Sequence, residues 1–128
     1  MQLNPECVRD VLLAIESADI HQRITLDWLA GKINYDNDEL WYTCIKLSEA
    51  GFLEVNTTRQ IRSPLPVISI IRGLTYQGHE FLNEIRDDTS WGKIKEIGKK
   101  VSIFSIKQLA DIAKTVACEV ITSALQQI

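Results

Sequence analysis

No stretch of this sequence is apolar for long enough to cross a membrane. A transmembrane helix needs about 18 or more consecutive apolar residues, and every window of that length contains charged side chains. The N-terminus also lacks the basic start, apolar run and small-residue cleavage site of a secretory signal peptide. We therefore expect a cytoplasmic protein that has no membrane partner.

Cysteine is scarce, and catalytic motifs are missing. Cys7, Cys44 and Cys118 are odd in number and widely spaced, and each falls within a helical apolar pattern, which favours reduced core thiols over disulfides or metal ligands. The sequence has no GxSxG, no HExxH and no phosphate-cradling glycine loop, and His21 and His79 lie in different predicted elements. These absences predict a protein that is not an enzyme and has no cofactor or metal.

A general excess of basic residues is also lacking, because 14 Lys and Arg face 17 Asp and Glu. The chain therefore has no overall charge signal for nucleic-acid binding. Its charge is unevenly distributed, however. Residues 55–75 carry three arginines and no acid, and residues 91–107 carry five lysines against one glutamate, whereas residues 1–54 hold ten acidic and four basic side chains. The sequence therefore has two basic segments within an acidic chain.

The chain does contain clear helix-start signals. Asn4 predicts the start of a first helix that carries Arg9 on its solvent side, and Thr25 predicts a second helix about two turns long. Asp36, with Glu39 three residues later, forms a capping-box pattern at the start of a third helix. Apolar residues recur at helical spacing in all three segments, so each helix is expected to bury one face.

Two β-branched segments follow the third helix, which is expected to end at Gly51. Residues 52–59 and 67–72 are expected to be strands, and the prolines between them favour a connecting loop. Thr75 then caps a fourth helix, in which Gly78 indicates a close approach of backbone. These segments predict a β-hairpin that leads into a core helix.

This order of elements predicts a mainly α protein with one β-hairpin, which is an α+β fold. Three helices, a hairpin and a helix follow the order of a winged helix-turn-helix domain, which we place over residues 1–88. Residues 89–104 are expected to form a basic linker or short helix. Residues 105–128 are expected to form a long amphipathic C-terminal helix.

Three segments carry a resemblance to a known family: "LNPECVRDVLLAIE", "KLSEAGFLEV" and "GLTYQGHEFLNEIRDDTSWGKIKE". Together they resemble an uncharacterised domain-of-unknown-function family of small bacterial and prophage-encoded proteins. The likeness covers most of the chain and includes Trp91, which follows the acidic "RDD". The resemblance implies a winged-helix-like body and a cytoplasmic bacterial or phage setting, and it brings no catalytic or binding motif.

The predicted wing offers the best candidates for DNA binding, because guanidinium groups without neighbouring acids can bind phosphate. The candidate contacts are Arg59, Arg62 and Arg72 in or beside the hairpin, and Tyr42, Thr43 and Lys46 in the third helix. Solvation of an edge strand explains the three arginines equally well, and the outward face of the third helix is net acidic. We expect a small DNA-binding or transcription-regulator-like protein of bacterial or prophage type.

A winged-helix module that binds protein instead of DNA is the alternative. The acidic third helix is bordered by Trp41, Tyr42 and Ile45, and aromatic side chains are common at interface centres. Packing of Trp41 in the core accounts for the same pattern. The exposure of its indole distinguishes the two explanations.

The C-terminal helix carries the strongest signal for a partner. Its apolar stripe either packs back on the body or pairs with a second copy, and we favour a homodimer. The residues assigned to this contact are Leu109, Ile112, Ala113, Val116, Val120, Ile121 and Leu125. The lysines that precede the helix are expected to contact phosphate or, more commonly, to be solvated.

Overall fold

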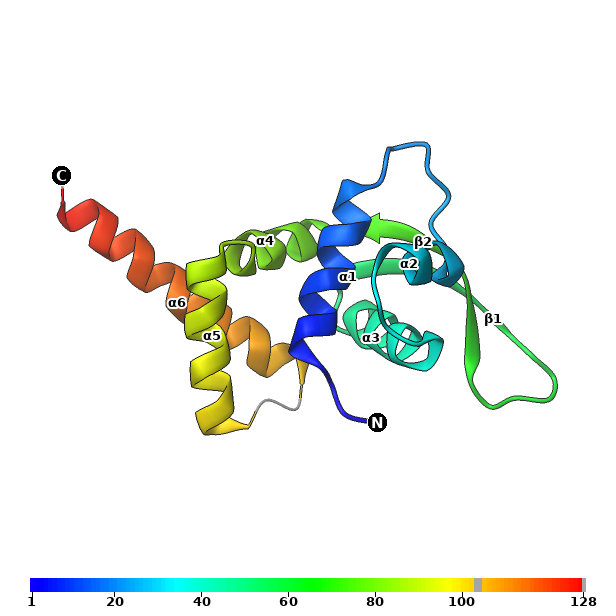
Figure 1. Cartoon of the computed structure of the whole chain (residues 1–128). Coiled ribbons are helices and arrows are strands. Elements are labelled where there is room, and N and C mark those ends of the chain that lie inside the picture. Colours follow the sequence, from blue (N-terminus) through cyan, green and yellow to red (C-terminus); the bar gives the residue numbers. More distant parts are fainter. Residues whose placement is uncertain (103–104, 128) are drawn as a thin grey trace.

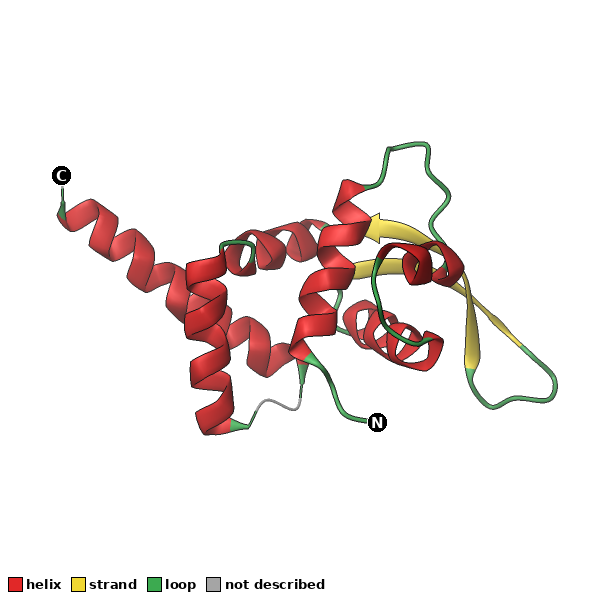
Figure 2. Cartoon of the chain, viewed as in Figure 1, coloured by secondary structure: helices red, strands yellow, loops and turns green. Residues whose placement is uncertain are grey.

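The computed structural model describes residues 1–102 and 105–127. Within them the chain forms six helices and two strands (Figures 1 and 2): α1 (Pro5–Ser17), α2 (Leu26–Lys32), α3 (Asn37–Glu49), β1 (Leu53–Arg59), β2 (Pro66–Leu74), α4 (Tyr76–Ile85), α5 (Asp88–Val101) and α6 (Ile106–Gln126). The fold is mainly α with one antiparallel hairpin, as predicted. Residues 103, 104 and 128 of the predicted linker and C-terminal helix lie outside the described residues.

Side-chain caps fix where the helices begin. The side chain before each helix accepts a backbone N–H of the first turn, and the caps are Asn4, Thr25, Asp36, Thr75, Asp87 and Ser105. The capping box predicted for α3 is only half formed. The Glu39 N–H donates to Asp36, but the Glu39 carboxylate accepts from Asn4 Nδ2 at 2.8 Å. This bond joins the start of α3 to the start of α1.

The hairpin is paired along its whole length, from Leu53 opposite Leu74 to Arg59 opposite Pro66. Its register shifts twice, which leaves Ser69 and Arg72 of β2 without a partner residue in β1. An extra residue in one strand turns the side chains that follow it to the other face. The buried residues of β2, Ile68 and Ile71, are therefore three positions apart instead of two. The two irregularities explain why the sequence of this strand alternates only in part.

Two glycines shape the junctions at either end of the hairpin. Gly51 has a φ of +82°, a left-handed conformation that ends α3 as predicted. Gly78, in the first turn of α4, lies against the Phe52 backbone, and a Cβ at this position would be 2.0 Å from the Phe52 carbonyl oxygen. The same oxygen accepts the Thr75 N–H at 3.2 Å. The close approach predicted at Gly78 is confirmed, because α4 can begin here only without a side chain at that position.

An apolar cluster with members in all six helices and both strands forms the core. α5 runs through Gly92 and Gly98 without a break and buries Trp91 and Ile94 in the same cluster as α1. The first half of α6 adds Leu109, Ala113 and Val116. α5 and the first half of α6 are therefore part of the packed body.

The second half of α6 differs from the first. Beyond Val116, the side chains of Val120, Ile121 and Leu125 are 45%, 59% and 65% exposed. Figure 1 shows this end of the helix extending away from α4 and α5. Part of the apolar stripe is therefore buried within the chain, and part of it is open.

Candidate nucleic-acid interface

The loop that connects β1 to β2 forms the most exposed part of the hairpin. We name residues 59–65 the hairpin tip, which lies at the far end of the hairpin from the helices (Figure 1). The Ser63 Oγ accepts the Leu65 N–H at 3.2 Å, and this bond orders the turn. Arg59 and Arg62 are exposed, and neither has an ion pair within the described residues. Their charges are therefore available to an anionic partner.

The hairpin tip is also apolar. Ile61 is fully exposed and Leu65 is 54% exposed, so two large aliphatic side chains accompany the two arginines. No acidic residue occurs between Glu54 and Glu80 in the sequence. Basic and aliphatic side chains are therefore exposed together on this loop, and neither kind is neutralised or covered by the rest of the described chain.

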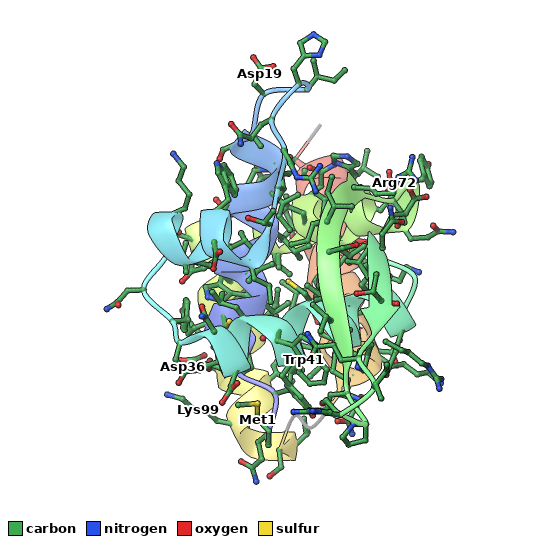
Figure 3. All side chains as sticks on the ribbon, turned by 90° about the vertical axis from the view of Figure 1, so that its right-hand side faces the viewer. Met1, Asp19, Asp36, Trp41, Arg72 and Lys99 are labelled. Carbon is green, nitrogen blue, oxygen red and sulfur yellow. The ribbon has the colours of Figure 1, made fainter. Side chains whose placement is uncertain are left out.

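Arg72 does not join the other two arginines. It is the unpaired residue near the opposite end of β2, about 20 Å along the strand from Pro66 at some 3.3 Å per residue. In Figure 3 Arg72 and Asp19 both lie in the upper part of the molecule, whereas Met1 and Lys99 lie at its lower end. Arg72 and His79 line a hollow there together with Glu16 and Asp19. The structure therefore separates the predicted three-arginine site into a pair at the hairpin tip and one arginine beside carboxylates.

The α3 candidates are less available than the sequence suggested. Thr43 is fully buried, and its hydroxyl donates to the Cys7 Sγ at 3.3 Å, so its assignment as a DNA contact is wrong. Thr43 lies at the edge of the apolar stripe of α3, and the spacing of that stripe does not indicate that α1 packs against this edge. Lys46 is paired with Glu49 at 3.1 Å and lies 5.5 Å from the centre of the Tyr42 ring. These two residues are half-buried and already partnered.

The exposed surface around α3 is dominated by carboxylates. Asp36, Asp38, Glu39 and Glu49 all belong to this helix or its cap, and Lys46 is its only basic residue. Trp41 is half-buried, and its indole N–H donates to the Pro66 carbonyl at 2.9 Å, which fixes it between α3 and the hairpin. Phosphate repulsion therefore disfavours α3 as a DNA-reading helix, and the hairpin tip is the better candidate.

The basic segment of α5 is partly engaged. Lys95 forms an ion pair with Glu6 at 2.9 Å. Its ammonium group lies 5.9 Å from the centre of the Trp91 ring, and the guanidinium of Arg9 lies 5.6 Å from the same ring. Because Lys95 donates to its carboxylate, the pKa of Glu6 is held below its ordinary value. Lys93, Lys99 and Lys100 are exposed on this helix.

Sequence reasoning missed the network that surrounds the "RDD" segment. Arg9, expected on the solvent side of α1, has a side chain only 14% exposed. It donates to the carbonyls of Ile85 and Arg86 at 2.9 and 2.6 Å and to Asp88 at 2.9 Å. Arg86 in turn pairs with Glu16. The sequence does contain one indication of this network: the oppositely charged segment "RDD" lies at the junction of two helices, shortly before Trp91.

The residues assigned to dimerisation fall into two groups. Leu109, Ala113 and Val116 are buried within the chain, and Ile112 is half-buried, so these four serve intramolecular packing. Val120, Ile121 and Leu125 are the exposed members. Of the residues assigned to dimerisation, only these three at the end of α6 are accessible in the single chain.

The cysteines also divide into two groups. Cys7 and Cys44 are buried, and burial raises the pKa of their thiols to about 11 and about 12, respectively. Cys118 is exposed, so the prediction that all three are core thiols is wrong for this one. Among the described residues, no group of three metal-ligating side chains is gathered, and no helix is long and apolar enough to span a bilayer.

The comparisons with known proteins show the family of this chain. An uncharacterized protein of Haemophilus influenzae is 31% identical over 124 residues, which cover 94% of this chain and 99% of that protein. No solved structure matches the chain. The model of the family described as "Hypothetical protein (DUF2513)" matches residues 2–104, which is the body up to the end of α5 and excludes α6. The chain belongs to the DUF2513 family.

Proposed function

We propose that this protein is a small non-enzymatic DNA-binding protein of the winged helix-turn-helix type, and that it binds through the hairpin tip. The observation that carries the proposal is the pair of exposed arginines, Arg59 and Arg62, which have no ion pair within the described residues. The order of helices and hairpin agrees with a winged helix. The short bridge from Ile24 to Ile71 adds a third backbone segment to the hairpin edge.

The expected mode of binding follows from the charges. Two arginines at the hairpin tip neutralise about two phosphates, and each neutralised phosphate contributes about −0.9 to the slope of log affinity against log salt. The acidic surface of α3, which is joined to the base of the tip by the Trp41–Pro66 hydrogen bond, is expected to repel phosphate and to weaken binding. Binding by a single copy is therefore expected to be weak, only modestly sequence-selective, and strongly reduced by salt.

Fluorescence anisotropy with a labelled random-sequence duplex tests this proposal. Binding is expected at about 50 mM salt and should fall at about 200 mM. Replacing both Arg59 and Arg62 by alanine should weaken it about tenfold or more. Arg23→Ala is the matched control, because Arg23 is an exposed arginine in the loop between α1 and α2, and it should stay within about twofold. Equal losses in both variants, or no binding at low salt, would contradict the proposal.

We also infer that two copies associate through the exposed end of α6. The stripe that buries Leu109, Ala113 and Val116 continues into Val120 and Leu125, and Glu119 is the only charged side chain from 115 to 127. A second copy offers a matching apolar surface of low charge, so two α6 ends can cover each other. Three half-exposed aliphatic side chains per copy contribute roughly 3 kcal/mol on burial. Two copies together barely offset the entropic cost of association, about 4–15 kcal/mol.

This balance predicts a weak dimer that becomes populated when DNA holds two copies near each other. Sedimentation velocity with and without duplex DNA is the measurement. Ile121→Glu should abolish the association, whereas Thr122→Glu, which places the same charge among the polar residues of the helix, should not. A monomer at every concentration, with or without DNA, would rule out this contact.

The alternative is a protein-binding module that uses the acidic α3 surface. Its support is limited to the part of the surface that the half-buried Trp41, Tyr42 and Ile45 leave exposed among the carboxylates of that helix. It becomes the preferred function if no DNA binding is found at low salt.

A further inference from the structure

A groove of about 260 Å³ lies where α4 and α6 pack together, away from the hairpin tip. We name it the α4–α6 groove. Its walls come from α4 between Tyr76 and Glu84, from Phe52 just before the hairpin, and from Ala110, Asp111 and Lys114 of α6. Nothing in the DNA-binding proposal uses these residues, so the groove needs an explanation of its own.

Aromatic rings line the groove. Phe52 and Phe81 stack with ring centroids 5.0 Å apart, and Phe81 is almost fully buried. Tyr76 lies at the rim and is 77% exposed, which is unusual for a large aromatic side chain. Rings of this kind attract cations through their negative faces and cover aliphatic chains by apolar contact.

Carboxylates surround these rings. Glu80, Glu84 and Asp111 line the groove, and Lys114 is the only basic side chain among its lining residues. Glu84 is half-buried, yet within the described residues its carboxylate has no hydrogen bond and no ion pair. Burial raises the pKa of Glu84, and the charge of Lys114 offsets this only in part. A partly desolvated carboxylate whose charge is only partly balanced is unfavourable in the free protein, and a bound cation would relieve it.

We propose that the α4–α6 groove binds a lysine or arginine side chain presented by a basic segment of a partner protein. A basic partner is chosen because of charge complementarity: the groove is lined by three carboxylates and by one lysine. The aliphatic stem of the bound side chain lies over Phe52 and Tyr76, and its charged end meets Glu84. Gln77 of α4 also lines the groove and is exposed, so the rest of the segment is expected to lie across this side of α4. This proposal is independent of DNA binding.

Titration with a short acetylated peptide that contains two lysines tests the proposal, with the full-length protein and isothermal calorimetry at low salt. The same peptide with norleucine in place of lysine keeps the aliphatic stem and removes the charge. The lysine peptide is expected to bind at least about tenfold more tightly than the norleucine peptide. Equal binding of the two peptides, or no binding of the lysine peptide, would overturn the proposal.

Four variants locate the binding in the groove. Glu84→Gln should weaken the lysine peptide about tenfold, whereas Glu96→Gln, which removes the same charge from an exposed position on α5, should change binding less than about twofold. Tyr76→Ala should weaken it about threefold. Lys114→Met should strengthen it severalfold, because it removes the only competing cation in the groove. If Lys114 had only a structural role, Lys114→Met would not strengthen peptide binding.

Two further results would count against the groove. Equal losses in Glu84→Gln and Glu96→Gln would mean that the peptide senses only the overall charge. Binding of free spermidine as tight as that of the lysine peptide would show that the ligand is a small polyamine and not a protein segment. Circular dichroism of each variant separates loss of binding from loss of the fold.

Discussion

The junction of α1, α4 and α5 and the hairpin tip use arginine in opposite ways. At the junction, Arg9 donates to two backbone carbonyls and pairs with Asp88, and Arg86 pairs with Glu16. These partners are distant in the sequence. At the hairpin tip, Arg59 and Arg62 are exposed and have no such partner within the described residues. The comparison teaches that the position of an arginine relative to packed helices decides whether it supports the fold or remains available to a ligand.

The largest expected effect tests how closely the body is packed. Gly78→Ala places a methyl group 2.0 Å from the Phe52 carbonyl oxygen, so either α4 or the hairpin must shift. We expect a loss of about 3 kcal/mol or more in the free energy of unfolding, measured by urea denaturation. The control is Gly92→Ala in α5, where an added Cβ meets no atom within 4 Å. It should be neutral or stabilising by up to about 1 kcal/mol. If the two variants had equal urea midpoints, the tight packing at Gly78 would not contribute to stability.

The second prediction compares the arginines directly. Arg9→Ala removes three hydrogen bonds at the junction of α4 and α5 and should lower the free energy of unfolding by about 2 kcal/mol. Arg59→Ala and Arg62→Ala should each change it by less than about 0.5 kcal/mol. Thermal and urea denaturation of the three variants decide the matter. A comparable loss at the hairpin tip would mean that its arginines are structural, and the proposed DNA site would lose its support.

The smallest effect concerns the carboxylates that hold the junction. Hydrogen bonds from Lys95 and Arg86, respectively, hold the pKa values of Glu6 and Glu16 below the ordinary 4.5. Because the ionised forms are favoured in the folded state, their stabilisation is complete above pH 4.5 and is lost as the pH falls below it. Each is worth less than about 1 kcal/mol, since both pairs are partly exposed.

Urea denaturation between about pH 5 and pH 3 measures this loss. Glu16→Gln should give a shallower decline in stability than the unchanged protein. Glu54→Gln, at an exposed position of β1, is the control and should leave the decline as it is. If stability fell equally with pH in Glu16→Gln and in the unchanged protein, the ion pair between Glu16 and Arg86 would add nothing to stability.

Much of the fold could be predicted from the sequence because its signals are local. The caps at Asn4, Thr25, Asp36 and Thr75 and the stop at Gly51 each depend on a few neighbouring residues, and all are confirmed. The failures involve partners that are distant in the sequence. Glu39 binds Asn4, 35 residues away, instead of completing a local cap.

The candidate site was harder to predict for the same reason. Thr43 seemed to lie at the edge of an exposed helix face, but α1 covers it. Arg72 seemed to belong with Arg59 and Arg62, but the length of β2 places it at the other end of the hairpin, where a register shift leaves it without a partner residue. Helical periodicity and sequence proximity give no information on which neighbour covers a face.

Cys118 provides a practical handle on the behaviour of α6. It is the one exposed thiol of the three, and the other two are shielded and hard to ionise. A maleimide dye should therefore attach at a single position, two residues before Val120. Energy transfer between donor-labelled and acceptor-labelled chains would then report when two C-terminal ends meet, without any engineered cysteine.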